Sequence, residues 1–351
     1  MSKRSILWGV IALLLVVVVV GATVGAVFYR EVERTGVFDC PSTTRLIVNE
    51  ETTMEDITEQ LYTKGKAKEL WAFGYLSQLF FSPSSPLYRR IHVGAYMLSS
   101  EMSLMDLVNN LRRQQQAPVR ITFNNIRTLS QFTERIAHQL PIPQDTLDNI
   151  LSDTAYITSM GFSPETLLAL FIPNTYEVYY TISPRQFIKR MHREYNVFWT
   201  EQRRAKAERL GLTPHEVVTL ASIVSEETRA KGEYSIVAGL YLNRIKRGMP
   251  LQADPTVKFA VGDFSLRRIL HKHLEVESPY NTYRNRGLPP GPICFPSPQV
   301  LDATLNAAQH NYIYMCARET FDGQHNFASS YSQHLHNARR YSRALNERNI
   351  K

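Results

Sequence analysis

Two adjacent glutamates stand at the end of an apolar segment, in the stretch LASIVSEETRA at residues 220–230. Residues 213–216 read Thr-Pro-His-Glu, a capping box with proline at the first helical position, which predicts that a helix starts there. At about 100° per residue, Glu227 falls in the middle of the apolar stripe, whereas Glu226 falls with Ser222 on the polar side. The pattern predicts that this helix buries one carboxyl and exposes its neighbour.

A carboxyl on an apolar face is costly as an anion, so its pKa rises and it stays protonated near neutral pH. That property suits a general acid, which makes Glu227 the candidate catalytic residue. A structural role remains open at this point, in which Glu227 caps the helix end or pairs with Arg229 or Arg244.

Two later segments carry side chains that suit a sugar. The first, LYLNRIKRGMPLQADPTVKFA, combines an apolar helix with a polar turn, and the second, SPYNTYRNRGLPPGP, is a loop with a rigid Pro-Gly ending. Aromatic rings stack on the apolar face of a sugar while amides and hydroxyls bond its rim, although each segment alone could be a structural turn. The candidate substrate-binding residues are Asn243, Gln252, Asp254, Thr256, Tyr280, Asn281, Tyr283 and His325.

A histidine cluster in HNFASSYSQHLH, made of His325, His334 and His336, invites a metal interpretation. No cysteine or carboxylate completes a recognisable ligand spacing, and polar residues near a glycan cleft explain the histidines as well. Neither a metal nor another cofactor is expected.

The N-terminus carries an apolar run that must position everything after it. Residues 6–29 contain no charge and exceed the roughly 20 residues that a membrane-spanning helix needs. The apolar part of a signal peptide would be shorter, about 7 to 15 residues. Because Lys3 and Arg4 precede the run, the positive-inside rule places residues 1–5 in the cytoplasm, 6–29 in the cell membrane and 30–351 outside.

That topology decides which partners the net charge of +8 indicates and whether the cysteines can form disulfides. An exported domain meets anionic lipid and acidic wall polymer, so nucleic acid is not an expected partner. Disulfides persist outside the cytoplasm, and either a bridge between Cys294 and Cys316 or buried free thiols, Cys40 included, would fit the odd number.

Strand-then-helix phrases organise the membrane-proximal part. A strand is expected at 45–50 before the helix TTMEDITEQLYTKG, and the pattern recurs in GAYMLSSEMSLMDLVNNLRR and in VRITF followed by residues 128–136. Such small units bury an apolar face only by packing against one another, as a spacer or as a carbohydrate-binding module. Residues 145–205 are expected to be mainly helical, interrupted by the extended FIPNTYEVYYTISP.

The blocks ASIVSEET, LNRIKRGMPLQADPTV, SPYNTYRNRGLPPGPI and HNFASSYSQHLHN resemble signatures of the MltG (YceG-like) family of membrane-anchored endolytic murein transglycosylases. That family usually reads ASIVEKE, with the second glutamate catalytic, and this residue aligns with Glu227. The first family glutamate is replaced here by Ser225, which puts an essential acid at that position in doubt.

The resemblance implies an α+β fold with a LysM-like module at 41–120, a linking α+β region at 121–205 and a catalytic domain at 206–351. It implies a lyase that cuts between MurNAc and GlcNAc of nascent peptidoglycan strands and so helps to end glycan elongation, with peptidoglycan synthases as candidate partners. Glu227 would act as acid and then base, Tyr280, Asn281 and Tyr283 would hold the sugars, and Gln252 and Asp254 would shape the cleft. The rival hypotheses are a muramidase that uses Asp254 as second carboxylate, since hydrolases need two, and a silent wall-binding anchor.

Overall fold

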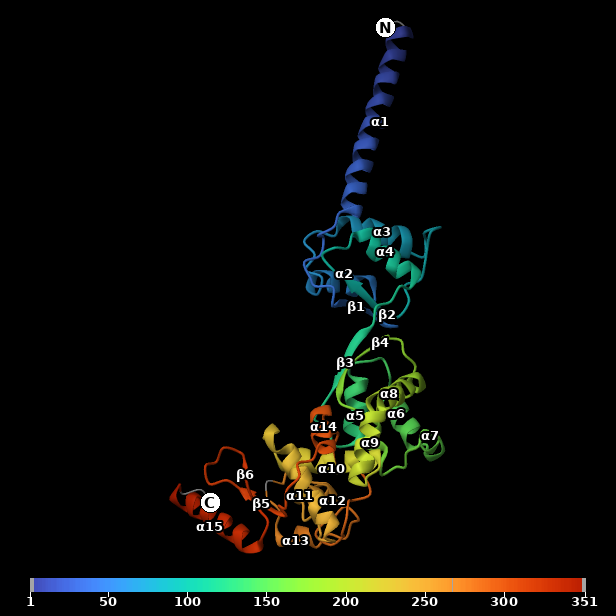
Figure 1. Cartoon of the computed structure of the whole chain (residues 1–351). Helices are drawn as coiled ribbons and strands as arrows, with labels where there is room; N and C mark the ends of the chain where they lie inside the picture. Colours follow the sequence, from blue (N-terminus) through green and yellow to red (C-terminus); the bar gives the residue numbers. More distant parts are fainter. Residues whose placement is uncertain (1–2, 267, 349–351) are drawn as a thin grey trace. The chain divides into compact units, whose positions relative to one another are not determined.

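The computed structural model describes residues 3–266 and 268–348 (Figure 1). The fold is mixed α+β, as predicted, and the strands of the described residues form three two-stranded sheets. Contacts divide the chain into two compact units. Unit 1 comprises Met1–Arg120 and Glu177–Ile182, and unit 2 comprises Ile121–Tyr176 and Ser183–Lys351.

Unit 1 begins with the long helix α1, Lys3–Glu33. Within the described residues, Leu7–Glu33 is the one helical segment that is long and apolar enough to cross a membrane, with a mean hydropathy of 3.0. The last turns of α1 differ from the exposed turns before them, because Val32 is buried in the core of unit 1 and Phe28 packs against that core. The predicted apolar helix is therefore present, while its orientation in a membrane stays a prediction.

The rest of unit 1 is a small sheet covered by helices. Strand β1, Thr44–Val48, pairs antiparallel with β2, Gly94–Leu98. The helices are α2, Met54–Thr63, α3, Trp71–Phe81, and α4, Leu104–Arg113. Capping boxes start both α2, at Thr53, and α4, at Ser103. In each box the cap hydroxyl accepts from the backbone N–H of an aspartate three residues later, and the carboxylate of that aspartate accepts from the backbone N–H of the cap residue. These elements confirm the first strand-then-helix phrase and the GAYMLSS phrase.

The third phrase folds as predicted but has a different partner. Strand β3, Val119–Phe123, precedes helix α5, Leu129–Ala137, which Thr128 caps. Strand β3 pairs with β4, Asn174–Val178, rather than with β1 or β2. The rings of Phe123 and Tyr176 stack with centroids 5.6 Å apart. The expectation that all three phrases pack against one another is therefore wrong, because the extended FIPNTYEV segment supplies the apolar partner that β3 needs.

The remainder of unit 2 is mainly helical and ends in a hairpin and a helix. Its further elements are α6, Gln144–Ser152; α7, Thr154–Ser159; η1, Leu167–Leu170; α8, Pro184–Phe198; α9, Glu201–Leu210; α10, Pro214–Glu227; η2, Lys231–Glu233; α11, Tyr234–Lys246; α12, Asp254–Val261; α13, His271–Leu274; α14, Pro298–Leu305; β5, Tyr314–Ala317; β6, His325–Ala328; and α15, Tyr331–Glu347. Strands β5 and β6 pair antiparallel, with Tyr314 opposite Ala328. Helix α10 packs against α9, α11, α12, α14 and η1.

Helix α10 starts at the predicted capping box but differs from the prediction in its polar side. Every residue from Val217 to Val224 is buried, including Thr219 and Ser222. The Ser222 hydroxyl donates to the Thr219 carbonyl at 2.7 Å and accepts from the backbone N–H of Ile293 at 3.0 Å. The predicted exposed polar face is wrong, because helices surround α10 and its small hydroxyls satisfy buried backbone groups.

The cysteines are free thiols. Cys40 and Cys294 are buried and Cys316 is partly buried. In the structure, Cys294 and Cys316 are not bridged, which agrees with the buried-thiol alternative.

Candidate active site

The C-terminal end of α10 delivers Glu227 to the wall of a cavity. The helix ends there because Thr228 turns to an extended conformation, so Glu227 occupies the last helical position. Its Oε1 accepts a hydrogen bond at 2.8 Å from the hydroxyl of Tyr241, on the neighbouring helix α11. Glu227 lines two hollows, of about 260 and 410 Å³, and Asp254 lines both as well. The two hollows thus meet at a pair of carboxyl groups.

The surroundings of Glu227 favour its protonated form. Burial raises its pKa to about 7, and the neighbouring carboxylates of Asp254 and Glu226 act in the same direction. The Tyr241 hydrogen bond and the Arg244 charge stabilise the carboxylate and offset part of this rise. Glu227 is therefore poised to give up and take back a proton near neutral pH.

The smaller hollow brings together residues from distant parts of unit 2. The turn before α12 contributes Gln252, and the first residue of α12 is Asp254. The loop after residue 280 contributes one further candidate and the β5–β6 hairpin another, beside walls from α10 and α11. Its lining residues are Glu227, Leu240, Tyr241, Arg244, Gln252, Asp254, Tyr283, Met315, Cys316, Ala317 and His325. Five of the nine predicted site residues therefore share one cavity, namely Glu227, Gln252, Asp254, Tyr283 and His325.

The second carboxyl of the cavity is held by a tyrosine of its own. The Tyr283 hydroxyl donates to Asp254 Oδ1 at 2.6 Å. Burial raises the pKa of Tyr283, and its bond to Asp254 acts in the same direction, so the phenol keeps its proton and remains a donor. The adjacent Gln252 has a left-handed backbone, with φ of 50°, and its N–H donates to the Thr282 carbonyl at 3.1 Å. This turn is thereby tied to the loop that carries Tyr283.

Arg244 is a buried cation of the cavity wall. Its guanidinium donates to the carbonyls of Ile313 at 2.7 Å and Leu251 at 2.6 Å. These bonds connect α11 to the turn before Gln252 and to the segment that enters β5. Arg244 therefore positions two walls of the cavity while lowering the pKa of Glu227 through its charge.

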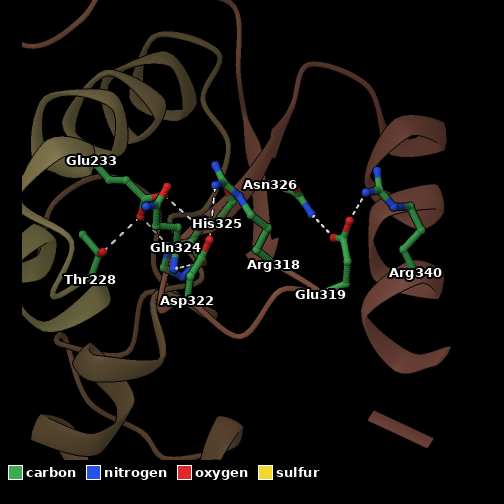
Figure 2. A network of polar contacts seen from close by, with 9 residues as sticks. All are labelled: Thr228, Glu233, Arg318, Glu319, Asp322, Gln324, His325, Asn326 and Arg340. Carbon is green, nitrogen blue, oxygen red and sulfur yellow. Dashed lines mark hydrogen bonds and ion pairs between the residues drawn. The ribbon is translucent and has the colours of Figure 1, made fainter. Parts of the chain in front are cut away.

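A buried acid fixes the hairpin that closes the cavity. Glu233 accepts from the His325 backbone N–H at 2.7 Å through Oε1, and its Oε2 lies 2.8 Å from His325 Nδ1. The Thr228 hydroxyl, one residue after Glu227, donates to the same Oε2 at 3.1 Å. Figure 2 shows Glu233 between Thr228 and His325, so the end of α10 and the start of β6 share one anchor.

The other side of the hairpin is tied to the last helix. Asn326 donates to Glu319 at 2.8 Å, and Glu319 forms an ion pair with Arg340 of α15 (Figure 2). The hairpin that contributes Met315 to Ala317 and His325 is thus held from both sides. Of the other predicted histidines, His334 stacks on Tyr314 with ring centroids 5.2 Å apart.

Glu226 differs from Glu227 in its partner rather than in simple exposure. Both are partly buried, so the prediction that Glu226 is exposed is wrong. The Glu226 carboxylate forms an ion pair with Arg127 at 2.7 Å, and it faces the larger hollow and a third one beside Ser225 and Cys294. The partner of Glu226 is thus the guanidinium of Arg127, whereas the partner of Glu227 is the hydroxyl of Tyr241.

The remaining predicted residues hold the loops together. Thr256 and Asn281 are buried, and Thr256 bonds Thr282 at 2.8 Å while Asn281 donates to the carbonyls of residues 274 and 276. Asn243 donates to the carbonyls of residues 310 and 312. Tyr280 packs against Phe259 with centroids 4.8 Å apart. None of these four lies in the lining of the two hollows that Glu227 shares, and their predicted contacts with substrate stay predictions.

Two residues of the site were missed by the sequence reasoning. Tyr241 stands among apolar residues in LYLNRI, where a phenol on a buried helix face signals a hydrogen-bonded partner inside the core. Glu233 has no such signal, because a lone glutamate after Lys-Gly resembles an exposed turn residue.

Comparisons with known proteins assign the chain to a family. A family model described as the YceG-like family matches residues 46–340. An endolytic murein transglycosylase of Bacillus subtilis (strain 168) is 34% identical over 166 residues, which are 47% of this chain and 45% of that protein. One of Streptococcus pneumoniae serotype 2 (strain D39 / NCTC 7466) is 32% identical over 130 residues, 36% of this chain and 23% of that protein. The matches thus span less than half the length of these curated relatives.

A crystal structure of a YceG-like protein from Listeria monocytogenes has the same fold. Its TM-score to this chain is 0.59 at 24% sequence identity, with 83% of this chain and 97% of that chain covered.

Proposed function

The chain belongs to the YceG-like family, and on that premise we propose that it is an endolytic murein transglycosylase, a lyase that cuts peptidoglycan strands internally between MurNAc and GlcNAc. The substrate is inferred from the activity for which the relatives are named, and the role of each residue is inferred from its place in the cavity. The observation that carries the proposal is the environment of Glu227. Its carboxyl lies where two hollows meet, and its pKa is about 7.

The proposed reaction uses Glu227 twice. Its carboxyl gives a proton to the glycosidic oxygen, so the bond from C1 of MurNAc to O4 of GlcNAc breaks and GlcNAc leaves with a free hydroxyl. The C6 hydroxyl of the same MurNAc attacks C1, and its proton passes to the Glu227 carboxylate. The product is a 1,6-anhydroMurNAc end, the enzyme regains its proton and no water is consumed.

The remaining cavity residues hold the substrate in this proposal. Gln252, Asp254, Tyr283 and His325 line the hollow beside Glu227 and offer donors and acceptors for sugar hydroxyls. A hydrolytic alternative uses Asp254 to activate water, because inverting and retaining glycosidases both need a second carboxylate. Against that role, Asp254 already accepts a bond at 2.6 Å from Tyr283.

Helix α1 indicates where in the cell the chain acts. We infer that α1 anchors the chain as a single-pass helix in the cell membrane, with the N-terminus in the cytoplasm and both units outside, near nascent strands and their synthases. The uncharged length of the helix supports this placement. We further infer that the β1–β2 module of unit 1 is a LysM-like glycan-binding module. A hollow of about 260 Å³ supports this role, because its lining combines aliphatic side chains with polar and aromatic ones such as Asn49, Thr52 and Tyr88.

The test is the chemistry of the new chain ends. The full chain should act on uncrosslinked glycan strands in ¹⁸O-labelled water, and the products should be weighed by mass spectrometry. We expect internal cuts with 1,6-anhydro ends that carry no label and are lighter by one water than hydrolysed ends. Reducing MurNAc ends that contain the label would establish the muramidase instead. The absence of new ends, with the chain still sedimenting with sacculi, would leave only a wall-binding anchor.

A further inference from the structure

Helix α3 of unit 1 presents an apolar stripe to its surroundings. Its sequence, WAFGYLSQLFF, contains no charged residue. Trp71, Tyr75 and Leu79, spaced four residues apart, lie on one side of the helix and are 45%, 64% and 44% exposed. Large side chains, two of them aromatic, therefore run along the outer face of α3 beside the exposed Gly74 and Gln78.

This face is not explained by the core of unit 1. The opposite side of α3 supplies the core, where Ala72, Phe73 and Leu76 are almost completely buried. A surface helix of a soluble domain normally turns charged and polar residues outward. Contiguous exposed apolar residues mark a surface that meets another apolar phase or a partner.

The stripe is continuous with the helix that we assign to the membrane. The ring of Phe28, near the end of α1, lies 5.9 Å from Trp71 and 6.3 Å from Tyr75, and the last two rings are 6.2 Å apart. Arg30 is the first charged residue after the apolar run, so the hydrocarbon boundary of α1 falls close to Phe28. In Figure 1, α3 lies at the end of unit 1 where α1 enters it. Trp71 and Tyr75 are thereby held at the depth of the headgroups, where these two residue types are enriched.

Basic groups flank the same helix. The Arg112 guanidinium lies 4.1 Å above the ring of Phe80 in α3, and the exposed Arg89 donates its backbone N–H to the Phe80 carbonyl at 2.7 Å. Arg30 is exposed at the end of α1. An apolar stripe with cations beside it is typical of helices that lie in the plane of an anionic membrane surface.

We propose that α3 is a membrane-docking helix, whose Trp71, Tyr75 and Leu79 stripe lies in the headgroup region of the bilayer beside α1. The partner is lipid rather than a second protein, because the stripe continues the apolar surface of the anchor without a break. Docking at two elements fixes unit 1 against the membrane surface, which a single flexible anchor would not. The proposal rests on the membrane assignment of α1 in the proposed function.

The test measures the depth of Trp71 in the full chain, purified and reconstituted into vesicles of phosphatidylglycerol and phosphatidylcholine. The chain has three tryptophans, Trp8 in α1, Trp71 in α3 and the buried Trp199 in unit 2. Subtracting the emission of Trp71→Phe, or of Trp8→Phe, from that of the wild type isolates each signal. We expect lipids with a nitroxide near the headgroup to quench both Trp71 and Trp8, because Trp8 lies about 30 Å of helix before Phe28 and therefore near the opposite surface of the membrane. Lipids with a nitroxide deep in the acyl chain should quench both residues less.

The outcomes separate the docking helix from the anchor. Quenching of Trp8 without quenching of Trp71 overturns the docking proposal, returns the stripe to a protein partner and leaves the anchor intact. Quenching of neither overturns both. The variant Tyr75→Glu should reduce Trp71 quenching, whereas Tyr179→Glu, at an equally exposed tyrosine outside α3, should not. Equal quenching in wild type and Tyr75→Glu would also contradict the proposal.

Discussion

The hydrogen bond from Tyr241 to Glu227 makes a quantitative prediction about pH dependence. A general acid works only while it is protonated, so kcat/KM should fall as pH rises through the Glu227 pKa of about 7. The Tyr241 hydroxyl donates at 2.8 Å and stabilises the carboxylate form. The substitution Tyr241→Phe removes that donor with little change of shape, so the pKa should rise and the alkaline limb should move to higher pH.

The size of the shift follows from the strength of the bond. A hydrogen bond to a charged group contributes about 1.5 to 3 kcal/mol, and one pKa unit corresponds to about 1.4 kcal/mol. The protonated carboxyl also accepts a weaker bond from the phenol, so the lower end applies and we expect a shift of about one pH unit. The variant should therefore keep activity at a mildly alkaline pH where the wild type has lost it.

The assay is the rate of anhydro-end formation across pH 5 to about 9, with kcat/KM reporting the free enzyme. The matched control is Tyr283→Phe, which removes the same hydroxyl from the same cavity but from Asp254. Its alkaline limb should move much less. If the limb of Tyr241→Phe stays in place or moves toward acid while the variant remains folded, then Glu227 is not the group that limits activity at high pH.

The other predictions concern the same walls. Glu227→Gln should lower kcat by about 10² to 10⁴, whereas Glu226→Gln, which loses only an ion pair with Arg127, should keep most activity; equal loss in both, with folding intact, would contradict the assignment. Because the folded pKa of Glu227 lies above its ordinary 4.5, its contribution to stability is complete below that value and is lost as pH rises to about 7. Glu227→Gln should therefore be more stable to urea than the wild type at pH 8, by up to about 3 kcal/mol, and equally stable at pH 4. Glu233→Ala should accelerate amide exchange in β5 and β6, since it leaves buried donors unpaired, and Asp322→Asn, at a more exposed acid of the same hairpin, should not.

The local patterns of the sequence predicted most of the individual elements. A capping box located the start of α10, and apolar periodicity in the strand-then-helix phrases located α2, α4 and α5, because these signals depend on residues within one or two turns. Which strands pair was not predictable in this way. Strand β3 repeats the pattern of β1, yet it pairs with β4, and that choice depends on contacts between residues about 50 positions apart.

The orientation of Glu227 was predicted from a helical phase whose premise was incomplete. The phase argument assumed one exposed face on α10, but Thr219 and Ser222 are as buried as the apolar residues. Glu227 reaches the cavity because the helix ends there and Tyr241 of α11 meets it. Helix termini and neighbouring helices are tertiary features, so residue types alone could nominate the carboxyl without describing its environment.

The arrangement of charges explains how one carboxyl can serve both halves of the proposed reaction. A proton donor that must afterwards accept a proton works best when its pKa lies near the ambient pH, because neither form is then strongly disfavoured. Burial raises the pKa of Glu227, and the Tyr241 hydroxyl and the buried Arg244 oppose that rise. Asp254 acts in the other direction while Tyr283 occupies one of its oxygens. The proposed contribution of Asp254 is thus to keep the pKa of Glu227 near 7 rather than to activate water. For this reason an unlabelled anhydro end is the expected product.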